Sequence, residues 1–318
     1  NRVGGFGGGD NAGAGAGMGG AIFNHRGSLN LTNVTMTGNS ASAGGGSLGS
    51  GLGAAIFNLN GNVTIAYSTL ANNTVSGSKD GALSGGPGDG AVYSLAYGNK
   101  IENGTASLAA LTITNSIISG TVGSNGAGNN DVVNNVVAGT HSSNTGNVAT
   151  LTWVGNNIVG ARLNATSSAG ATASQNGAPT SNANPNLDAL ANNGGPTQTM
   201  LPLTGSPAIN AAASCTGANG FDQRGVARPY GPACDIGAVE VVPSYAVGGS
   251  ISGATAPVGL TLTSSPAVTP QSPSFGNGNF IFTTPLLYTG CNCNATSRHG
   301  ARSACRNQVP HYLRPDAH

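Results

Sequence analysis

A segment that recurs at a fixed spacing constrains the fold of this chain more than any other feature. The stretch Ala21–Asn24 returns as Ala55–Asn58, and Leu29 further along returns as Val63, so the copies are offset by 34 residues. A looser third copy starts at Ala91 and resumes, after an insertion, at Leu111, and a fourth trace starts at Ala149. Self-similarity at a constant period indicates a stacked array of structural units.

The pattern within each repeat is that of a β-strand. Leu29 and Leu31 alternate with polar residues, as do Val63 and Ile65, and this period of two is typical of a strand with one buried face. No window shows the spacing of an amphipathic helix. A single repeat cannot bury its apolar face, but a neighbour stacked about 4.8 Å away can do so. We therefore predict an all-β chain whose residues 1–162 form a right-handed parallel β-helix, clearest over about 19–162, with the hand taken from the bias of parallel crossovers.

The 34-residue offset also predicts the register and the core. Leu29 should lie beside Val63, and Leu31 beside Ile65. Phe23 or Phe57 alone could face outward against a loop, and Trp153 could be a platform for a sugar, although we favour the core for it. The residues predicted to face inward are Ile22, Phe23, Leu29, Leu31, Val34, Met36, Ile56, Val63, Ile65, Leu70, Ile113 and Ile118.

Asn24 and Asn58 occupy the same place in successive repeats. In a stack they would lie above one another and could form a hydrogen-bonded amide ladder. Asparagine also tolerates the left-handed conformation that a corner needs. The alternative is an asparagine in an ordinary turn.

Charge is scarce along the whole chain. Charged residues make up 7% of the sequence and the net charge is +1, which argues against nucleic acid and anionic membranes as partners, since both need clustered Lys and Arg. No apolar run approaches the ~20 residues of a membrane helix. Residues 121–148 and 163–183 are expected to be irregular excursions. Because the sequence begins inside a Gly-rich stretch, we expect further coils and an export signal before it.

The texture of the sequence changes at residue 184. The motifs from here on are Asn184-Pro185-Asn186-Leu187, Asn192-Asn193-Gly194-Gly195-Pro196-Thr197, Gly205-Ser206-Pro207-Ala208-Ile209-Asn210, Asp222-Gln223-Arg224-Gly225 and Asp235-Ile236-Gly237-Ala238. This block resembles the choice-of-anchor Q domain, which ends large bacterial surface and secreted β-helix proteins. The resemblance covers roughly residues 15–241 and is strongest over 184–240. It implies an extracellular or cell-surface location.

Physical features of residues 163–241 agree with a capping region. Its prolines stop regular strand pairing, as a cap over the end of a stack should. We expect Arg224 to pair with Asp235 or Asp222 and pin the turn. The alternative role for these acids is glycoside hydrolysis.

Two cysteines bracket this charged stretch. A disulfide between Cys215 and Cys234 would contribute about 3 kcal/mol in the chain-entropy model. Such a bond fits an oxidising, extracellular setting.

The last two segments differ from the rest. Residues 242–288 resemble part of an immunoglobulin-like β-sandwich repeat, and 289–318 are expected to be a disordered or out-of-frame tail. Two metal sites are less favoured alternatives: calcium at Gly4–Asp10, from its similarity to a calcium-binding nonapeptide, and zinc. The zinc ligands would be Cys291, Cys293, His299 and Cys305.

These features predict a non-enzymatic extracellular stalk or adhesin-like protein that presents loops to polysaccharides or cell-surface components. No catalytic residue, cofactor or metal is expected. The alternative is a polysaccharide lyase or glycoside hydrolase on the same fold, which needs a carboxylate pair or a basic residue beside acidic ligands. The acids before residue 183 are scattered in the repeat. Asp80 and Asp89 come closest, but they share one Gly-rich loop that we expect to fix no geometry.

Overall fold

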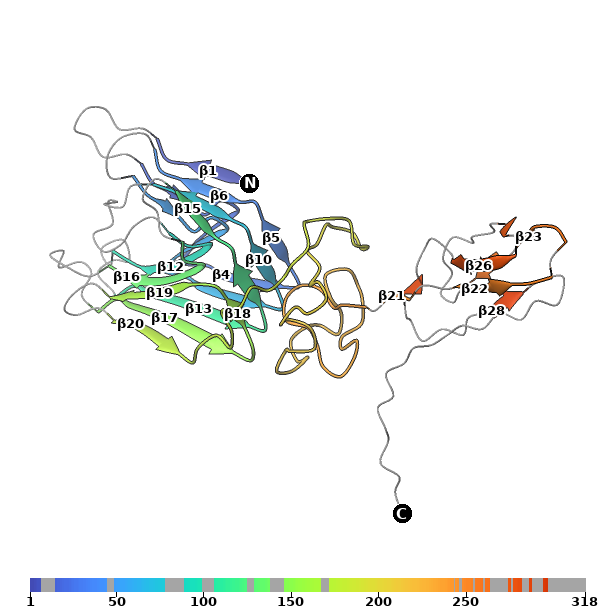
Figure 1. Cartoon of the computed structure of the whole chain (residues 1–318). Helices are drawn as coiled ribbons and strands as arrows, with labels where there is room; N and C mark the ends of the chain where they lie inside the picture. The colour runs from blue at the N-terminus through green and yellow to red at the C-terminus, as the bar shows by residue number, and fades with distance from the viewer. Residues whose placement is uncertain are drawn as a thin grey trace, which may run out of the picture. The chain divides into compact units, whose positions relative to one another are not determined.

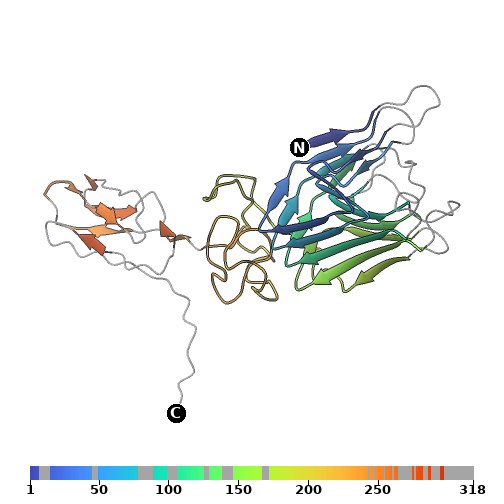
Figure 2. The ribbon, with the colours of Figure 1, turned by 180° about the vertical axis from the view of Figure 1, so that it is seen from behind.

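The computed structural model describes residues 1–6, 15–44, 49–77, 89–98, 106–124, 129–137, 146–166 and 172–242, and beyond these 244–245, 248–253, 255–259, 261–263, 274–275, 277–281, 286–287 and 294–296. The chain forms two compact units, residues 1–241 and 242–318. Within the described ranges all regular secondary structure is β, and the first unit is a stack of parallel strands (Figures 1 and 2).

Four parallel sheets recur in the first unit, and we number them I to IV. Sheet I contains β3 (Ile22–His25), β8 (Ile56–Leu59), β12 (Val92–Ala96), β16 (Val132–Val136) and β19 (Arg162–Thr166). Sheet II contains β4 (Ser28–Thr32), β9 (Asn62–Ala66), β13 (Leu108–Thr114), β17 (Val148–Val154) and β20 (Thr172–Asn176).

The other two sheets have shorter strands. Sheet III contains β5 (Thr35–Thr37), β10 (Thr69–Ala71), β14 (Ile117–Ser119) and β18 (Ile158–Val159). Sheet IV contains β1 (Arg2–Gly4), β6 (Ser40–Ser42), β11 (Thr74–Ser76) and β15 (Val122–Ser124). A short parallel pair joins β2 (Gly17–Met18) to β7 (Gly51–Leu52).

Successive repeats pass through sheets I, II and III in the same order, so equivalent residues lie side by side. Leu29 pairs with Val63 and Leu31 with Ile65, which confirms the predicted register. Val63 in turn pairs with Leu111, although a longer segment separates them in the sequence. These stacked parallel sheets are consistent with a β-helix or solenoid-like fold.

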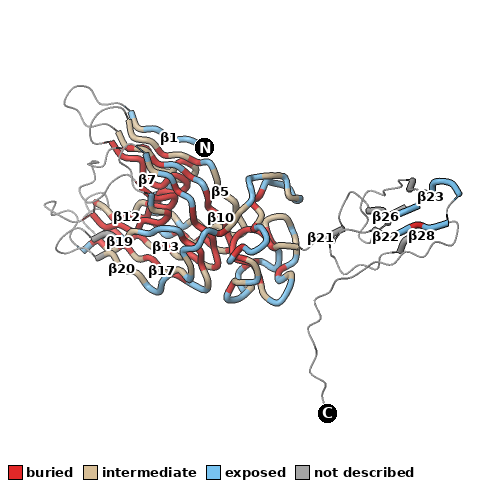
Figure 3. The backbone as a smooth tube through the Cα atoms, in the orientation of Figure 1, coloured by how far each residue is buried: buried red, intermediate tan, exposed pale blue. Residues whose placement is uncertain are grey.

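The apolar core lies between sheets I, II and III. The inward residues predicted from the second repeat onward are all buried, and Trp153 packs among them with 7% exposure (Figure 3). In the first repeat the inward positions are only half-buried, because β3, β4 and β5 are edge strands in their sheets. These half-buried positions are Ile22, Leu29, Leu31, Val34 and Met36.

The inward prediction for Phe23 is wrong. Phe23 is 50% exposed and stacks on Phe57, with ring centroids 5.5 Å apart. Adjacent residues of a strand point to opposite faces, so Ile22 and Phe23 cannot both enter the core. Phe57 lies on that same outer face but is buried, in a cluster with Leu52 and Tyr93.

The corner between sheets II and III needs a left-handed backbone in every repeat. The φ angles at successive corners are 57° at Asn33, 45° at Tyr67, 44° at Asn115 and 61° at Gly155. Asparagine and glycine adopt this conformation readily, whereas tyrosine does so rarely. The tyrosine at this corner therefore requires compensating contacts, which come from residues 214–216.

Two stretches expected to be irregular contain strands of the stack. Within residues 121–148, β15 joins sheet IV, and all five residues of β16 are buried. Within 163–183, β19 continues sheet I to residue 166 and β20 extends sheet II to Asn176. Parallel stacking thus runs past residue 162, where the sequence placed the end of the coils.

Residues 184–241, the flank segment, pack against the side of the stack, next to β10 and β18 (Figure 1). The expectation was a cap over the end. Instead, Ala208 and Ile236 belong to one buried cluster with Ile117 and Ile158, which lie on the outer face of sheet III. At the last repeat, residues 180 and 181 bond to the carbonyl of Asn157.

The second unit consists of antiparallel strand pairs. The pairs are β21 (Ser244–Tyr245) with β27 (Leu286–Leu287), β22 (Gly248–Ile251) with β26 (Gly278–Ile281), β23 (Val258–Gly259) with β25 (Ser274–Phe275), and β24 (Thr261–Thr263) with β28 (Asn294–Thr296). Strand β28 falls inside the predicted tail, so that part of 289–318 has regular structure. The proposed zinc ligands lie outside the described residues.

Candidate functional site

The asparagine ladder predicted at the corner between sheets I and II is present. Asn24 Nδ2 donates to Asn58 Oδ1 at 2.8 Å, and Asn58 Nδ2 donates to Ser94 Oγ at 3.0 Å. Further along the same row, Asn134 Nδ2 donates to Asn164 Oδ1 at 2.7 Å. Asn58, Ser94 and Asn134 are 0% exposed. The ladder therefore holds the corner, and these three members are out of reach of a ligand.

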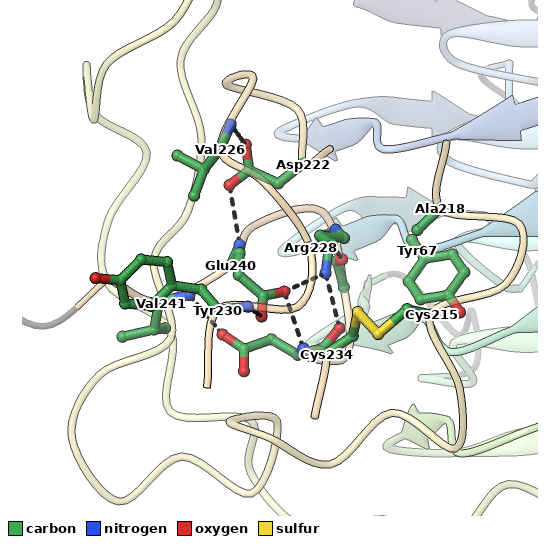
Figure 4. A network of polar contacts seen from close by, with 12 residues as sticks. Tyr67, Cys215, Ala218, Asp222, Val226, Arg228, Tyr230, Cys234, Glu240 and Val241 are labelled. Carbon is green, nitrogen blue, oxygen red and sulfur yellow. Dashed lines mark hydrogen bonds and ion pairs between the residues drawn. A yellow bond between two sulfur atoms is a disulfide. The ribbon is translucent and has the colours of Figure 1, made fainter. Parts of the chain in front are cut away.

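A buried ion pair forms the centre of the flank segment (Figure 4). Arg228 Nη1 lies 2.9 Å from Glu240 Oε2, and both side chains are 0% exposed. The same guanidinium donates to the carbonyls of Asp235 and Gly237 at 3.0 and 2.6 Å. It also lies over the ring of Tyr67, 5.3 Å from the centroid, as in a cation–π contact. Burial lowers the pKa of Arg228, and the charge of Glu240 opposes that shift.

A second ion pair matches one of the two predicted alternatives. Arg224 Nη2 lies 2.8 Å from Asp222 Oδ2. The other carboxylate oxygen, Oδ1, accepts the backbone N–H groups of Arg224 and Val226 at 2.7 and 2.9 Å, so Asp222 closes the turn that contains them. Arg224 therefore pins the turn through Asp222, and Asp235 is not its partner.

Asp235 instead links distant parts of the flank segment through backbone groups. Its Oδ1 accepts the N–H of Asn210 at 2.6 Å, and its Oδ2 accepts that of Val241. Asp235 is 1% exposed, and burial raises its pKa to about 6. Its carboxyl group organises the chain around it and is not open to a substrate.

The predicted disulfide is confirmed, with Cys215 and Cys234 at a Cα–Cα distance of 5.6 Å. Beside it, the single O–H of Tyr67 lies within hydrogen-bond distance of the carbonyls of Ser214 and Thr216, and Asn115 Nδ2 donates to that hydroxyl at 2.8 Å. Tyr67 thus ties the corner of the stack to the flank segment.

Sequence reasoning missed both Tyr67 and the Arg228–Glu240 pair. A signal existed for Tyr67, because it replaces Asn33 at the equivalent position one repeat on. An aromatic residue at a corner suggests that something covers that corner. The ion pair has no such repeat signal.

Asp89 and Asp131 are the acids of the stack that come closest to an active-site arrangement. Val92 pairs with Val132, so Asp131 lies opposite Ala91, two residues after Asp89. Burial raises the pKa of Asp89, and the neighbouring charge of Asp131 adds to the rise; burial also raises the pKa of Asp131. As the sequence indicated, the two acids do not occupy equivalent positions in their repeats, although the charge of Asp131 acts on Asp89.

Both carboxyl groups are nevertheless engaged by the backbone. Asp89 Oδ1 accepts the N–H groups of Gly90 and Asn130, each at 2.8 Å. Asp131 accepts the N–H of Thr121 through Oδ1 and that of Ala161 through Oδ2, each at 2.9 Å. Asp89 is 1% exposed, so its geometry is fixed, contrary to the expectation of a loose loop. Its suggested partner Asp80 lies outside the described residues.

Neither a metal site nor a membrane span is found in the part of the chain that the structure describes. No cluster of three or more His, Cys, Asp and Glu side chains could hold a metal ion there. The same residues contain no helix of the length and apolarity that a membrane crossing requires. Most of the glycine-rich calcium motif falls outside them.

The outer face of sheet II carries neither an aromatic nor a charged side chain along its two central rows. Thr64, Thr112 and Thr152 follow one another in register across β9, β13 and β17. Each is half-exposed, whereas Val63, Leu111 and Leu151 on the inner face are buried. This face can therefore offer hydroxyl and amide groups to a ligand.

Comparison with other proteins gives no relative: no family model, curated protein or solved structure matches this chain.

Proposed function

We propose that this chain is part of a non-enzymatic extracellular protein, a stalk or adhesin-like molecule built on a right-handed parallel β-helix. Repeats that visit the same sheets in the same order support a continuous coil, and parallel crossovers are right-handed in nearly all proteins. A long array of this kind keeps its ends apart and exposes its sides to other surfaces.

The proposal rests on the structural role of the carboxylate side chains. In the first unit, the described acids are Asp89, Asp131, Asp188, Asp222, Asp235 and Glu240. Asp188 alone is exposed among them; the others are at most 5% exposed and accept backbone N–H groups. A glycosidase needs two carboxyl groups that reach its substrate. Here the acids stabilise loops and turns instead.

An extracellular location is supported by two features. The Cys215–Cys234 disulfide suits an oxidising compartment. The resemblance of residues 184–240 to the choice-of-anchor Q domain points to a surface or secreted protein, with polysaccharides or cell-surface components as partners. Scarce charge continues to argue against nucleic acid.

The test is an assay for polymer cleavage by the purified chain. We expect no reducing ends or unsaturated products above those of a heat-denatured sample, on neutral and acidic polysaccharides alike. Product formation that survives repurification would sink the proposal.

The enzyme alternative draws support from one observation, the neighbouring buried acids Asp89 and Asp131 with raised pKa values. Raising the pKa of a carboxyl group favours the protonated form that a general acid needs. If cleavage is detected, Asp89→Asn and Asp131→Asn should each abolish it, whereas Asp188→Asn, at an exposed position, should not.

A further inference from the structure

We infer that the outer face of sheet II is a docking surface for an uncharged, extended polysaccharide whose chain runs across the strands. The inference rests on the proposed function, because it assigns the contact surface of a non-enzymatic binder. It places that surface on a sheet face, where the sequence had suggested loops.

The residues of this face form a regular lattice. The central row, in register from β4 to β20, is Asn30, Thr64, Thr112, Thr152 and Asn176. The row beside it is Ser28, Asn62, Ala110, Thr150 and Ser174. Neighbours within a row are about 4.8 Å apart, the strand spacing, and the two rows are about 6.7 Å apart, two residues along a strand.

Every side chain in both rows is exposed or half-exposed. Outer positions of sheets I and III, which enclose the apolar core together with sheet II, differ sharply. In sheet I, Phe57 and Tyr93 are 0% and 1% exposed, and in sheet III the flank segment buries Ile117 to 0%. Of these three sheets, sheet II is therefore the one whose outer face stays open along its central strands.

The lattice is rigid before any ligand arrives. Threonine is branched at Cβ and has few χ1 rotamers, and its backbone is held on both sides by paired strands. Within the rows, Ser174 Oγ donates to Thr150 Oγ1 at 3.3 Å and Asn176 Nδ2 donates to Thr152 Oγ1 at 3.4 Å. A surface that is already ordered loses little conformational entropy on binding.

The chemistry of the rows selects the ligand. Hydroxyl and amide groups both donate and accept hydrogen bonds, as sugar hydroxyls do, and threonine methyl groups can contact the C–H edges of a sugar ring. The rows carry no charge, so an acidic polymer would gain nothing there. The strand spacing of about 4.8 Å is close to the length of one sugar residue in an extended chain, so successive sugars can meet successive strands.

Affinity on such a surface must come from repetition. A single hydrogen bond exchanged with water contributes little, and the two rows offer no aromatic ring for stacking. Several contacts made by one chain add as in multivalent binding. We therefore expect glucose to bind undetectably and retention to rise steeply with the length of the glucan.

The experiment measures retention of the whole chain by affinity electrophoresis in gels that contain a soluble neutral β-glucan, with polygalacturonate and free glucose as comparison probes. Thr112→Lys should weaken retention about fivefold, the loss of roughly one hydrogen bond, and Thr152→Lys should do the same. Thr112→Ser should keep it. The control is Thr74→Lys, at an exposed strand position of sheet IV, which should retain wild-type binding.

Circular dichroism melting of each variant separates loss of binding from loss of folding. Equal retention of the Thr112→Lys and Thr74→Lys proteins would overturn the inference, as would tighter retention by polygalacturonate than by the neutral glucan. Regular rows of threonine could instead bind ice. A wild-type protein that shapes ice crystals but is not retained by glucan would therefore also overturn the inference. Cleavage of the glucan would instead refute the proposed function, so the two failures are distinguishable.

Discussion

The outer faces of sheets II and III are built by successive strands of the same repeats, yet one is open and the other is covered. Thr112 in β13 is half-exposed, and its counterpart Thr152 is as well. A few residues on, Ile117 in β14 and Ile158 in β18 are 0% and 1% exposed under the flank segment.

The strands themselves carry the difference. In β13 apolar and polar residues alternate, as expected of a strand with one wet face. In β14 and β18 two apolar residues follow one another, Ile117-Ile118 and Ile158-Val159. A strand buried on both faces reads as a continuous apolar run. The paired apolar residues of β14 and β18 thus match strands that are buried on both faces.

The largest expected effect concerns the buried ion pair at the centre of the flank segment. Arg228→Met leaves the buried carboxylate of Glu240 without its cation, and removing one partner of such a pair costs about 3–5 kcal/mol. We expect that loss in chemical denaturation, with new protease cleavage within residues 184–241.

Arg224→Met is the matched control, because Arg224 has 9% side-chain exposure against 0% for Arg228. It should cost clearly less. If both variants unfold alike, the buried pair has no special role in holding the cover to sheet III.

The second-largest expected effect on stability comes from the disulfide. Replacing Cys215 and Cys234 together by alanine releases a loop closed over a sequence separation of 19 residues, which is worth about 3 kcal/mol in the chain-entropy model. The melting temperature of the flank segment should fall. Tyrosine fluorescence, which responds to the exposure of Tyr67, monitors this unfolding. A reduced wild-type protein should match the double variant, and an unchanged melting temperature in both would contradict the expectation.

The stability of the flank segment should also depend on pH, whereas the outer face of sheet II should make no such contribution. Because burial raises the pKa of Asp235 to about 6, folding favours its protonated form. That contribution is fully present below the ordinary pKa of about 3.9 and is lost as pH rises through about 6, a change on the order of 2–3 kcal/mol.

Unfolding free energies measured from pH 4 to pH 7 test this directly. The stability of the wild type should fall over that range, and Asp235→Asn should flatten the slope even though it loses the hydrogen bond from Val241. A wild-type stability that rises with pH would show that other groups dominate.

The fold was predictable where side-chain period and repeat offset act together. The pairing of Leu29 with Val63 follows from the offset alone. Strand β16 was missed because Asn134 and Asn135 interrupt its apolar run, although both are buried; Asn134 belongs to the polar ladder, and Asn135 bonds to Tyr93 Oη at 2.8 Å. Polar residues that stack on copies of themselves can enter a core without an apolar signature.

In the flank segment, the disulfide could be predicted from the sequence, whereas most of the polar contacts could not. The Cys215–Cys234 bond follows from chemistry and spacing. The partner of Arg228 does not, because loops without a period decide which carboxylate reaches it. The placement of the flank segment on the side of the stack was also missed, since prolines report where pairing stops and not which surface the chain then covers.

The smallest expected effect compares the outer faces of sheets II and III directly, because threonine is replaced by alanine on each. Thr69 in β10 is 1% exposed, and its Oγ1 accepts the N–H of Ala238 in the flank segment at 3.0 Å. Thr69→Ala leaves that buried N–H without a partner, which costs about 1–3 kcal/mol. Thr112→Ala removes a hydroxyl from the open face, where surface substitutions stay within about 0.5 kcal/mol. Denaturant titrations of the two variants should therefore differ by about 0.5 to 3 kcal/mol. Equal values would mean either that the flank segment is not seated on sheet III or that the face of sheet II is covered, and hydrogen exchange at Ala238 would tell these apart.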